Sequence, residues 1–408
     1  MRKITYMKLA LYTWKKQRMI AFLVLFQLIV MFMLGLSCIS MIHEKFPLYN
    51  SVQSLLKGDG IVIQSYGIED ELRAPVHNKE ILAQTLDSTN AFSSYNVWAA
   101  VYKGKESMDF EVRAYDEEII NAYKPKIETG RWLSDEANDK ILYAVISQNP
   151  YGIDVGDRIL LYDVLAEKQV IPVETEIIGL LENNAMVSGF STTTSNQTDY
   201  RNLYQSTNYE YLSKPLLLLS AEQLQKVNTK MGNNYLVMQA QNLSWLCAES
   251  PKQLDECKTT LLQDGVTILG EFDEIRETNN DIFFQELFQI FPIFLCAFIM
   301  CLITEVSIGA IIGRNMQRDY GIYRLCGLNK RGCFAIQALS FLYVIGSALS
   351  IAIIVGKYLS EVGLFSETVI RIEALEIVCL LVIMAINLIL ASIVPARILA
   401  NANISEML

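Results

Sequence analysis

The sequence predicts an α-helical membrane domain of four transmembrane helices in a 1+3 arrangement, with a large α+β domain inserted after the first helix. Four long apolar segments support this prediction: Met19–Ser40, Ile290–Ile312, Cys333–Gly356 and Leu375–Val394. A helix of about 20 apolar residues is long enough to cross the ~30 Å hydrocarbon core of a bilayer. Between the first two segments lies a polar stretch of roughly 240 residues, which is long enough to form a complete domain.

Positive charges beside these segments predict the orientation of the chain. Six Lys and Arg residues precede the first segment, and the loop 313–332 carries five more against one acid, Asp319. Lys and Arg near membrane ends favour the cytoplasmic side. We therefore expect a multi-pass protein of a bacterial plasma membrane, with both termini and this loop inside and the inserted domain outside.

The expected parts follow one another along the chain. They are a cytoplasmic amphipathic segment 1–18, transmembrane helix 19–42, an extracytoplasmic domain with helical stalks 43–282, transmembrane helix 283–312, a cytoplasmic loop 313–332, transmembrane helix 333–356, an outer loop 357–374, transmembrane helix 375–394 and a cytoplasmic tail 395–408. A cleaved signal peptide is the less favoured alternative for the first apolar segment. Its apolar stretch exceeds the usual 7–15 residues, and bulky Met41 and Ile42 follow it.

The inserted domain is acidic. Residues 43–282 contain 20 Lys and Arg against 36 Asp and Glu, whereas the whole chain has a formal net charge of −10. Such a surface is unsuited to direct binding of nucleic acid or anionic lipid headgroups. We interpret it as mainly solvated, with binding of a cationic ligand as the alternative.

Hydrophobic periodicity and turn residues predict mixed α/β structure in this domain. We expect strands at Ile61–Ser65, Phe92–Tyr102, Asp109–Tyr115, Lys140–Ile146, Arg158–Asp163, Gln169–Leu181, Tyr235–Gln239 and Val266–Gly270, and helices at Lys79–Leu86, Ala221–Thr229 and Pro251–Leu262. The charged residues 271–289 are expected to form a helix that leads into the second apolar segment. The Ser-, Thr- and Asn-rich stretch 186–211 is expected to be a loop or insertion.

Residues suited to catalysis or metal binding are scarce. The two histidines, His43 and His77, have no ligand partner at a metal-binding spacing, and we expect both at the surface. The stretch Gly104–Glu106 lacks the upstream Gly and the Ser or Thr of a phosphate-binding loop. We therefore predict a non-catalytic chain with no cofactor or metal of its own. Cys247 and Cys257 lie in the outer domain, and whether they form a disulfide stays open.

The cytoplasmic loop contains the most specific motif. Residues 314–331 read Arg-Asn-Met-Gln-Arg-Asp-Tyr-Gly-Ile-Tyr-Arg-Leu-Cys-Gly-Leu-Asn-Lys-Arg. This resembles the stretch after the second membrane helix in MacB/FtsX-type (type VII) ABC transporter permeases, where an Arg-rich helix end leads into Gly-Ile-x-Arg-x-x-Gly and a basic pair. Asp319 stands where that family usually has Glu, and Cys326 stands where Ala is common.

Three further patches resemble the same family. They are Pro395–Ala400 with Ile404–Leu408, Gly130–Trp132, and Val155–Asp157 with Ile177–Gly179. The first resembles a closing Pro-Ala-Arg and Pro-x-Glu-Ala-Leu, with Ile404 in place of Pro. The other two resemble the Gly-Arg and Val-Gly-Asp…Val-x-Gly-Ile patterns of the MacB-like periplasmic core domain. With the 1+3 topology, the resemblance covers nearly the whole chain except the insertion 186–214.

The resemblance implies the permease subunit of an ABC transporter complex that exports or extracts peptide, antibiotic or lipid-like substrates. A separate ATPase, which would hold ATP and Mg, would dock on the cytoplasmic loop and drive motion of the outer domain. The implied coupling residues are Arg318, Asp319, Gly321, Arg324, Leu325, Gly327 and Leu328. The implied partners are this ATPase, a second identical or related permease chain, an extracytoplasmic adaptor or hydrolase, and membrane lipid.

Two other functions stay open. An FtsX-like mechanotransducing permease would control a cell-wall hydrolase or a signalling partner and transport nothing. A receptor or adhesin that needs no ATPase is less favoured.

One acid and three amides lie within the apolar segments and are candidates for contacts between helices. Glu305 is costly in a membrane and should face protein or water, so we expect a structural role at a helix or dimer contact, with a proton or substrate role as the alternative. Gln27, Gln337 and Asn387 are expected to form interhelical hydrogen bonds.

Overall fold

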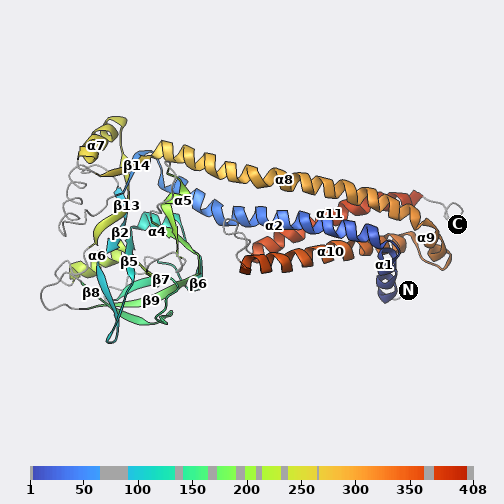
Figure 1. Ribbon diagram of the computed structural model, residues 1–408, viewed down its shortest axis with the longest axis horizontal. Helices are drawn as coiled ribbons and strands as arrows, with labels where there is room; N and C mark the ends of the chain where they lie inside the picture. Colours follow the sequence, from blue (N-terminus) through green and yellow to red (C-terminus); the bar gives the residue numbers. More distant parts are fainter. Residues whose placement is uncertain are drawn as a thin grey trace. The chain divides into compact units, whose positions relative to one another are not determined.

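The computed structural model describes residues 3–64, 91–133, 141–163, 172–189, 198–207, 214–230, 238–263, 266–362 and 372–401 (Figure 1). The chain divides into two compact units. The inserted unit is Pro47–Phe283, and the helical unit is Met1–Phe46 with Phe284–Leu408.

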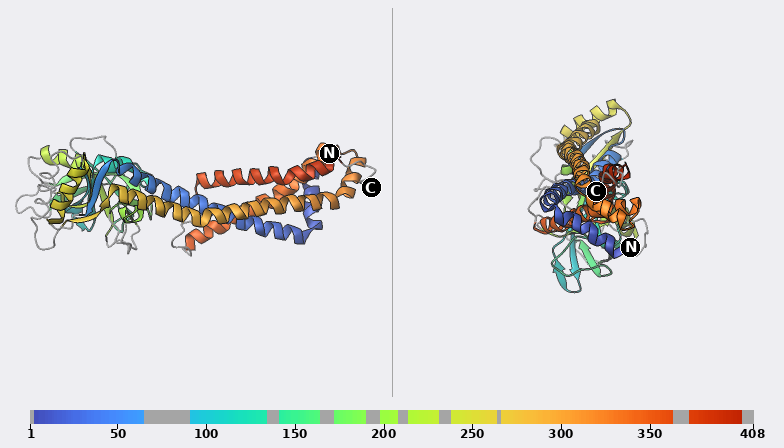
Figure 2. Two further views of the ribbon diagram at one scale, coloured as in Figure 1. Left: turned by 90° about the horizontal axis from the view of Figure 1, so that it is seen from above. Right: turned by 90° about the vertical axis from the view of Figure 1, so that its right-hand side faces the viewer.

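The helical unit is built from long helices. They are α1 (Lys3–Lys16), α2 (Arg18–Leu55), α8 (Phe272–Asn315), α9 (Gln317–Leu325), α10 (Lys330–Val362) and α11 (Ala374–Asn401). Within the described residues, α2, α8, α10 and α11 are long and apolar enough to cross a membrane, which confirms the predicted set of four helices. Figure 2 shows these helices from two further sides. The sequence of α2 and of α8 also contributes to the inserted unit.

Two of the predicted intramembrane amides join neighbouring helices. The amide of Gln27 on α2 donates to Thr304 Oγ1 on α8 over 3.2 Å. The amide of Asn387 on α11 donates to Ile383 O over 2.9 Å and lies 3.9 Å from Met31 Sδ on α2. Because lipid offers no hydrogen bonds, such contacts help to hold helices together in a membrane.

The inserted unit contains one large mixed sheet. Its described strands are β1 (Asp59–Gln64), β2 (Ala91–Val97), β3 (Ala99–Lys103), β4 (Glu106–Met108), β5 (Glu111–Tyr115), β6 (Ile127–Gly130), β7 (Leu142–Ile146), β8 (Arg158–Asp163), β9 (Val173–Leu181), β12 (Leu216–Ser220), β13 (Met238–Ala248) and β14 (Thr267–Glu271). They run in the order β14-β1-β13-β2-β5-β12-β7-β9-β8-β3-β4, with β6 paired to β9. A second, two-stranded sheet joins β10 (Met186–Ser188) to β11 (Tyr204–Ser206).

Strand β12 lies near the centre of the large sheet and is buried on both faces. Its four leucines, Leu216–Leu219, are all 0% exposed. It pairs in parallel with β5 and antiparallel with β7. A continuous apolar run is typical of a strand that is covered on both faces. The described helices of this unit are α4 (Glu117–Ala122), α5 (Tyr200–Leu203), α6 (Ala221–Lys230) and α7 (Pro251–Gln263).

Several sequence expectations differ from the structure. The expected strand Phe92–Tyr102 is two strands that separate at the exposed Trp98. The stretch 186–211, expected to be a loop or insertion, contains the regular elements β10, α5 and β11 in its described part. Strand β13 continues to Ala248, beyond the predicted end at Gln239. The extension was missed because polar residues interrupt the alternation of apolar and polar side chains. Pairing with β1 and β2 on either side places β13 inside the sheet. The expected helix Lys79–Leu86 lies outside the described residues.

Cys247 on β13 and Cys257 on α7 do not form the disulfide that the sequence left open. Neither cysteine is joined in a disulfide bond. Burial raises the pKa of each thiol, so neither is activated as a thiolate.

Candidate functional site

The predicted coupling loop folds as the short helix α9 followed by a tight turn. The helix ends at Leu325, and the N–H of Cys326 donates to Ile322 O over 3.0 Å. Gly327 then adopts a φ of +91°, a left-handed conformation that costs glycine little. This turn reverses the chain into α10, which begins at Lys330.

Helix α9 is held to its neighbours by side chains on its inner face. Tyr320 is 0% exposed, and its hydroxyl donates to Gln337 Oε1 on α10 over 2.6 Å. Burial raises the pKa of Tyr320, so the hydroxyl remains a neutral donor. Lys16 Nζ of α1 pairs with Asp319 Oδ2 over 3.0 Å. Helix α9 is therefore fixed on both α1 and α10.

The same face includes two of the predicted coupling residues, which are turned inward. Gly321 is buried. Leu328 is 6% exposed and packs in the core of the helical unit. A Cβ on Gly332 would come within 2.7 Å of Leu328 Cδ1, so glycine at this position makes room for the leucine. Leu328 supports the turn and is not exposed to a partner in this structure.

The outer face of α9 combines exposed apolar and basic side chains. Leu325 is 62% exposed, and Ile322, three residues before it, is 45% exposed. Arg318 is exposed one turn before Ile322, and Lys330 and Arg331 are exposed beyond the turn. Residues at i, i+4 and i+7 share one side of a helix. We call this surface, made of Arg318, Ile322, Leu325, Lys330 and Arg331, the α9 face.

Sequence reasoning identified part of this face. Leu325 and Arg318 belong to it, whereas Arg324 is half-buried. Ile322 was not among the predicted coupling residues. It belongs to the family-like motif Gly-Ile-x-Arg, and its own exposure was not considered. Its i, i+3 spacing with Leu325, opposite the inward Tyr320 and Gly321, was the available signal. The coupling role of all these residues stays a prediction.

Two of the family-like patches lie on paired strands of the inserted unit, and each contributes a glycine to the same close backbone contact. Gly130 of β6 and Gly179 of β9 are register partners. Gly130 has a φ of +84°, and a Cβ there would lie 2.2 Å from Ile178 O. A Cβ on Gly179 would lie 2.3 Å from Arg131 O. The two glycines therefore permit a backbone approach that any larger residue would block.

Val155–Asp157, the segment that was paired with Ile177–Gly179 in the family-like pattern, forms the turn before β8. Gly156 has a φ of +92°, and its N–H donates to Ile177 O over 2.8 Å. Asp157 Oδ2 accepts from Lys103 Nζ over 2.6 Å and from the Asp154 N–H over 3.0 Å. The Lys103 hydrogen bond, followed by that from Asp154, lowers the pKa of Asp157. These patches thus specify how strands pair.

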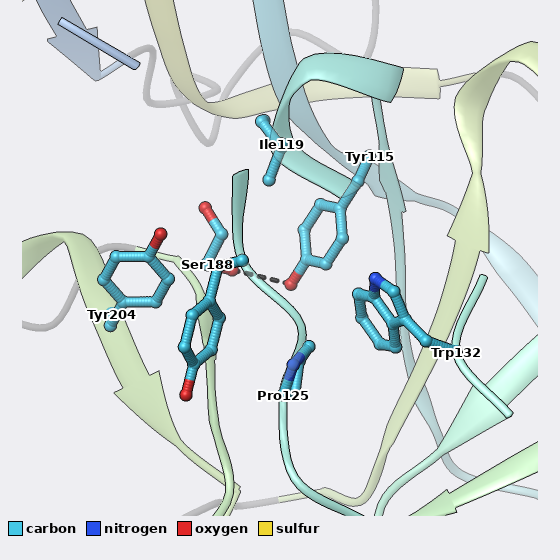
Figure 3. A pocket seen from close by; sticks show the side chains of 7 residues that line it. Tyr115, Ile119, Pro125, Trp132, Ser188 and Tyr204 are labelled. Carbon is cyan, nitrogen blue, oxygen red and sulfur yellow. Dashed lines mark hydrogen bonds between the residues drawn. The ribbon is translucent and has the colours of Figure 1, made fainter. Parts of the chain in front are cut away.

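The described part of the insertion contributes Ser188 and Tyr204 to the lining of a small aromatic pocket of about 190 Å³ including its open mouth (Figure 3). Tyr115 donates to Ser188 O over 2.6 Å, and burial raises the pKa of Tyr115 to about 12. Ser188 Oγ is buried and has no hydrogen-bond partner among the described residues. The remaining lining residues are Ile119, Tyr123, Pro125, Trp132 and Tyr204.

The insertion also contacts the ends of both helices that enter the inserted unit. Tyr204 Oη lies 2.6 Å from Ser51 Oγ on α2. The N–H of Tyr200 donates to Asn279 Oδ1 on α8 over 3.1 Å. The described part of the insertion therefore contacts both α2 and α8 within the inserted unit.

Glu305 of α8 faces protein. It is 1% exposed, and neither carboxylate oxygen has a hydrogen-bond partner within the described residues. One turn earlier, Cys301 Sγ lies 3.7 Å from Gln27 O of α2. The placement agrees with the expected orientation toward protein, and its role stays a prediction.

No protein-family model and no curated protein matches the chain. Two solved structures match about half of it. The extracellular domain of the noncanonic ABC-type transporter YknZ from Gram-positive bacteria matches with 12% identity and a TM-score of 0.26, over 52% of this chain and 100% of that one. The periplasmic region of MacB from Actinobacillus actinomycetemcomitans matches with 11% identity and a TM-score of 0.29, over 56% of this chain and 94% of that one.

Proposed function

We propose that this chain is the permease subunit of an ABC transporter complex and that a separate ATPase docks on the α9 face. The observation that carries the proposal is the exposure of Ile322 and Leu325 at 45% and 62% on a helix that is otherwise anchored inward. Flanking Arg318 and Arg331 provide charge that an acidic partner would complement. The chain has no phosphate-binding loop of its own, so the nucleotide would be held by the partner.

The rigid backing of α9 suits a role in force transmission. Tyr320 and Asp319 attach the helix to α10 and α1, so a push on the α9 face is passed to the transmembrane helices. Burial of one leucine side chain at an interface stabilises it by about 1.5–3 kcal/mol. Burial of both Ile322 and Leu325 would therefore contribute enough binding free energy for its loss to be measured as weaker binding of the partner.

The docking test is co-purification of the full chain with candidate ABC ATPases from the same genome. We expect Leu325→Asp to weaken the complex at least about tenfold, because a carboxylate would be buried in an apolar groove. Asn329→Asp is the matched control, since it adds the same charge four residues away and keeps the oxygen that accepts the Gly332 N–H at 2.7 Å. Equal complex formation by Leu325→Asp and the control would refute docking on the α9 face.

The proposal extends to mechanical transmission through α2 and α8. Within the inserted unit, Tyr49 of α2 stacks on Phe283 of α8 with centroids 4.5 Å apart, and its hydroxyl donates to Asn280 Oδ1 over 2.5 Å. The amide of Gln53 also donates to Asn280 Oδ1, over 3.2 Å. These contacts put the α2–α8 junction at residues 49–53 and 276–283. A shift of one helix along the other would move the whole inserted unit.

A disulfide between Gln53→Cys and Asn280→Cys should block transport while assembly and basal ATP hydrolysis persist. The reduced double variant is the control for the two substitutions themselves. Normal function of the oxidised protein would contradict mechanical transmission.

The FtsX-like function without transport is the second candidate. Its support is the shortage of polar side chains in the transmembrane helices, which offers no hydrated path for cargo. Release of a cell-wall hydrolase activity by the assembled complex, with no substrate efflux, would favour it over export.

A further inference from the structure

Three ligand-type side chains meet where the second half of α2 passes the start of α11. They are His43 of α2, Glu376 in the first turn of α11, and Glu373 just before α11. One ligand atom from each lies within 4.8 Å of the other two. His43, expected at the surface, has a side chain that is 29% exposed, and its Nδ1 lies 2.5 Å from Glu376 Oε1. The two residues are 333 positions apart, so no sequence spacing could have shown the pair.

The buried acid of this cluster is Glu376. The Glu376 side chain is 0% exposed, and its other oxygen accepts from the Glu373 N–H over 3.0 Å. Among the residues that the structure describes, no Lys or Arg forms an ion pair with Glu376. A buried carboxylate is costly unless positive charge lies beside it. His43 supplies that charge only when it is protonated, and Glu373 brings a second acid to the cluster.

We propose that His43, Glu373 and Glu376 bind a divalent transition-metal ion of the Zn²⁺ class. One imidazole nitrogen with two carboxylates suits Zn²⁺, Ni²⁺ or Cu²⁺ better than Mg²⁺ or Ca²⁺, which prefer oxygen ligands alone. Tetrahedral ligands at about 2.0–2.2 Å from Zn²⁺ stand roughly 3.4 Å apart, so small side-chain rotations complete the site. Water fills the fourth position, since the His43 side chain is 29% exposed and Glu373 is exposed.

Such an ion would fasten α2 to the start of α11. It would neutralise the buried Glu376 and hold α2 at His43. This inference does not depend on the proposed docking of an ATPase.

The test uses the full chain in detergent, stripped with a chelator and with its exposed thiols at Cys296 and Cys326 alkylated so that they cannot bind metal. Zn²⁺ is titrated against a fluorescent chelator. We expect one tight Zn²⁺ per chain and at least about tenfold weaker binding in His43→Gln and in Glu373→Gln. Glu44→Gln is the matched control, because it removes the neighbouring carboxylate that is not part of the cluster.

A spectroscopic measurement identifies the ligands. Co²⁺ bound in place of Zn²⁺ should give d–d bands without a thiolate charge-transfer band, and these bands should vanish in His43→Gln. Glu373→Gln keeps the test informative if changes at the buried Glu376 prevent folding. Absence of stoichiometric Zn²⁺ binding, or equal binding by the control and both variants, would overturn the proposal and leave His43 and Glu376 as a hydrogen-bonded pair only.

Discussion

The helical unit and the inserted unit place the same apolar residue types in opposite positions. In the helical unit Phe22 and Phe288 are each 65% exposed and Ile354 is 68% exposed. In the inserted unit Leu216–Leu219 are 0% exposed. Water drives the second arrangement through the hydrophobic effect, whereas lipid makes exposure of apolar side chains cost nothing. The difference teaches that exposure of an apolar side chain has to be interpreted against the solvent of its unit. The proposed docking therefore rests on apolar residues outside the spans, such as Leu325.

The treatment of buried charge differs in the same way. Arg113 of the inserted unit is 3% exposed, and its guanidinium bonds to Glu111 Oε1 over 2.6 Å and to Gln205 Oε1 over 2.9 Å. Glu305 of the helical unit is buried without a partner among the described residues. Arg113 thus has partners for its charge within the inserted unit, whereas the Glu305 carboxyl is buried with none among the described residues.

The largest expected contrast between the units is the response to a single added methyl group. Gly130→Ala should destabilise the inserted unit by about 3 kcal/mol, because φ of +84° disfavours alanine and its Cβ would overlap Ile178 O. Gly346→Ala in α10 should be neutral or slightly stabilising, since a Cβ there meets nothing within 4 Å and alanine favours helix. Thermal unfolding of the full chain in detergent measures both. A Gly130→Ala protein as stable as Gly346→Ala would break the contrast.

The helical unit was easier to predict from sequence than the inserted unit. A run of about 20 apolar residues has one physical solution in a bilayer, so four such runs gave four helices. Short strands are ambiguous, because their neighbours in the sheet decide their burial. Arg158–Asp163 was predicted as a strand, whereas β12 was not predicted although its residues form an apolar run. The alternation in β13 is hidden by Gln and Asn, and its place between β1 and β2 depends on pairing across the chain.

The candidate site was predicted in composition and not in orientation. The motif located α9 and the turn at Gly327, whose positive φ agrees with its glycine. Which face of α9 is outward depends on Tyr320 reaching Gln337 in another helix, and no local pattern encodes that contact. The cluster at His43 depends in the same way on a helix more than 300 residues later.

The comparison of buried charges predicts opposite responses to neutralisation. Arg113→Met should cost about 2 kcal/mol, because Gln205 Oε1 and Ser188 O lose a charged donor. Glu305→Gln should leave stability unchanged or raise it, since it removes a buried charge that has no described partner. Unfolding temperatures of the two variants against the unmodified chain give the answer. If Glu305→Gln destabilises as much as Arg113→Met, the expected structural role of Glu305 at a helix or dimer contact gains support over the alternative proton or substrate role.

The smallest expected effect concerns a surface pair in the inserted unit and its dependence on pH. The hydrogen bond from Lys103 lowers the pKa of Asp157 below its ordinary value of about 3.9. A carboxyl whose folded-state pKa is depressed stabilises the fold above its unfolded-state pKa, and this contribution is lost as the pH falls through the folded-state pKa.

Because the Asp157 side chain is 34% exposed, the contribution is under about 1 kcal/mol. Asp157→Asn should therefore be slightly less stable than the unmodified chain at pH 7 and equally stable near pH 2, with Lys105→Gln, a change to a neighbouring exposed lysine, as the control at both pH values. A stability difference that is the same at pH 7 and pH 2 would show that the Asp157 turn acts through its backbone geometry and not through its charge.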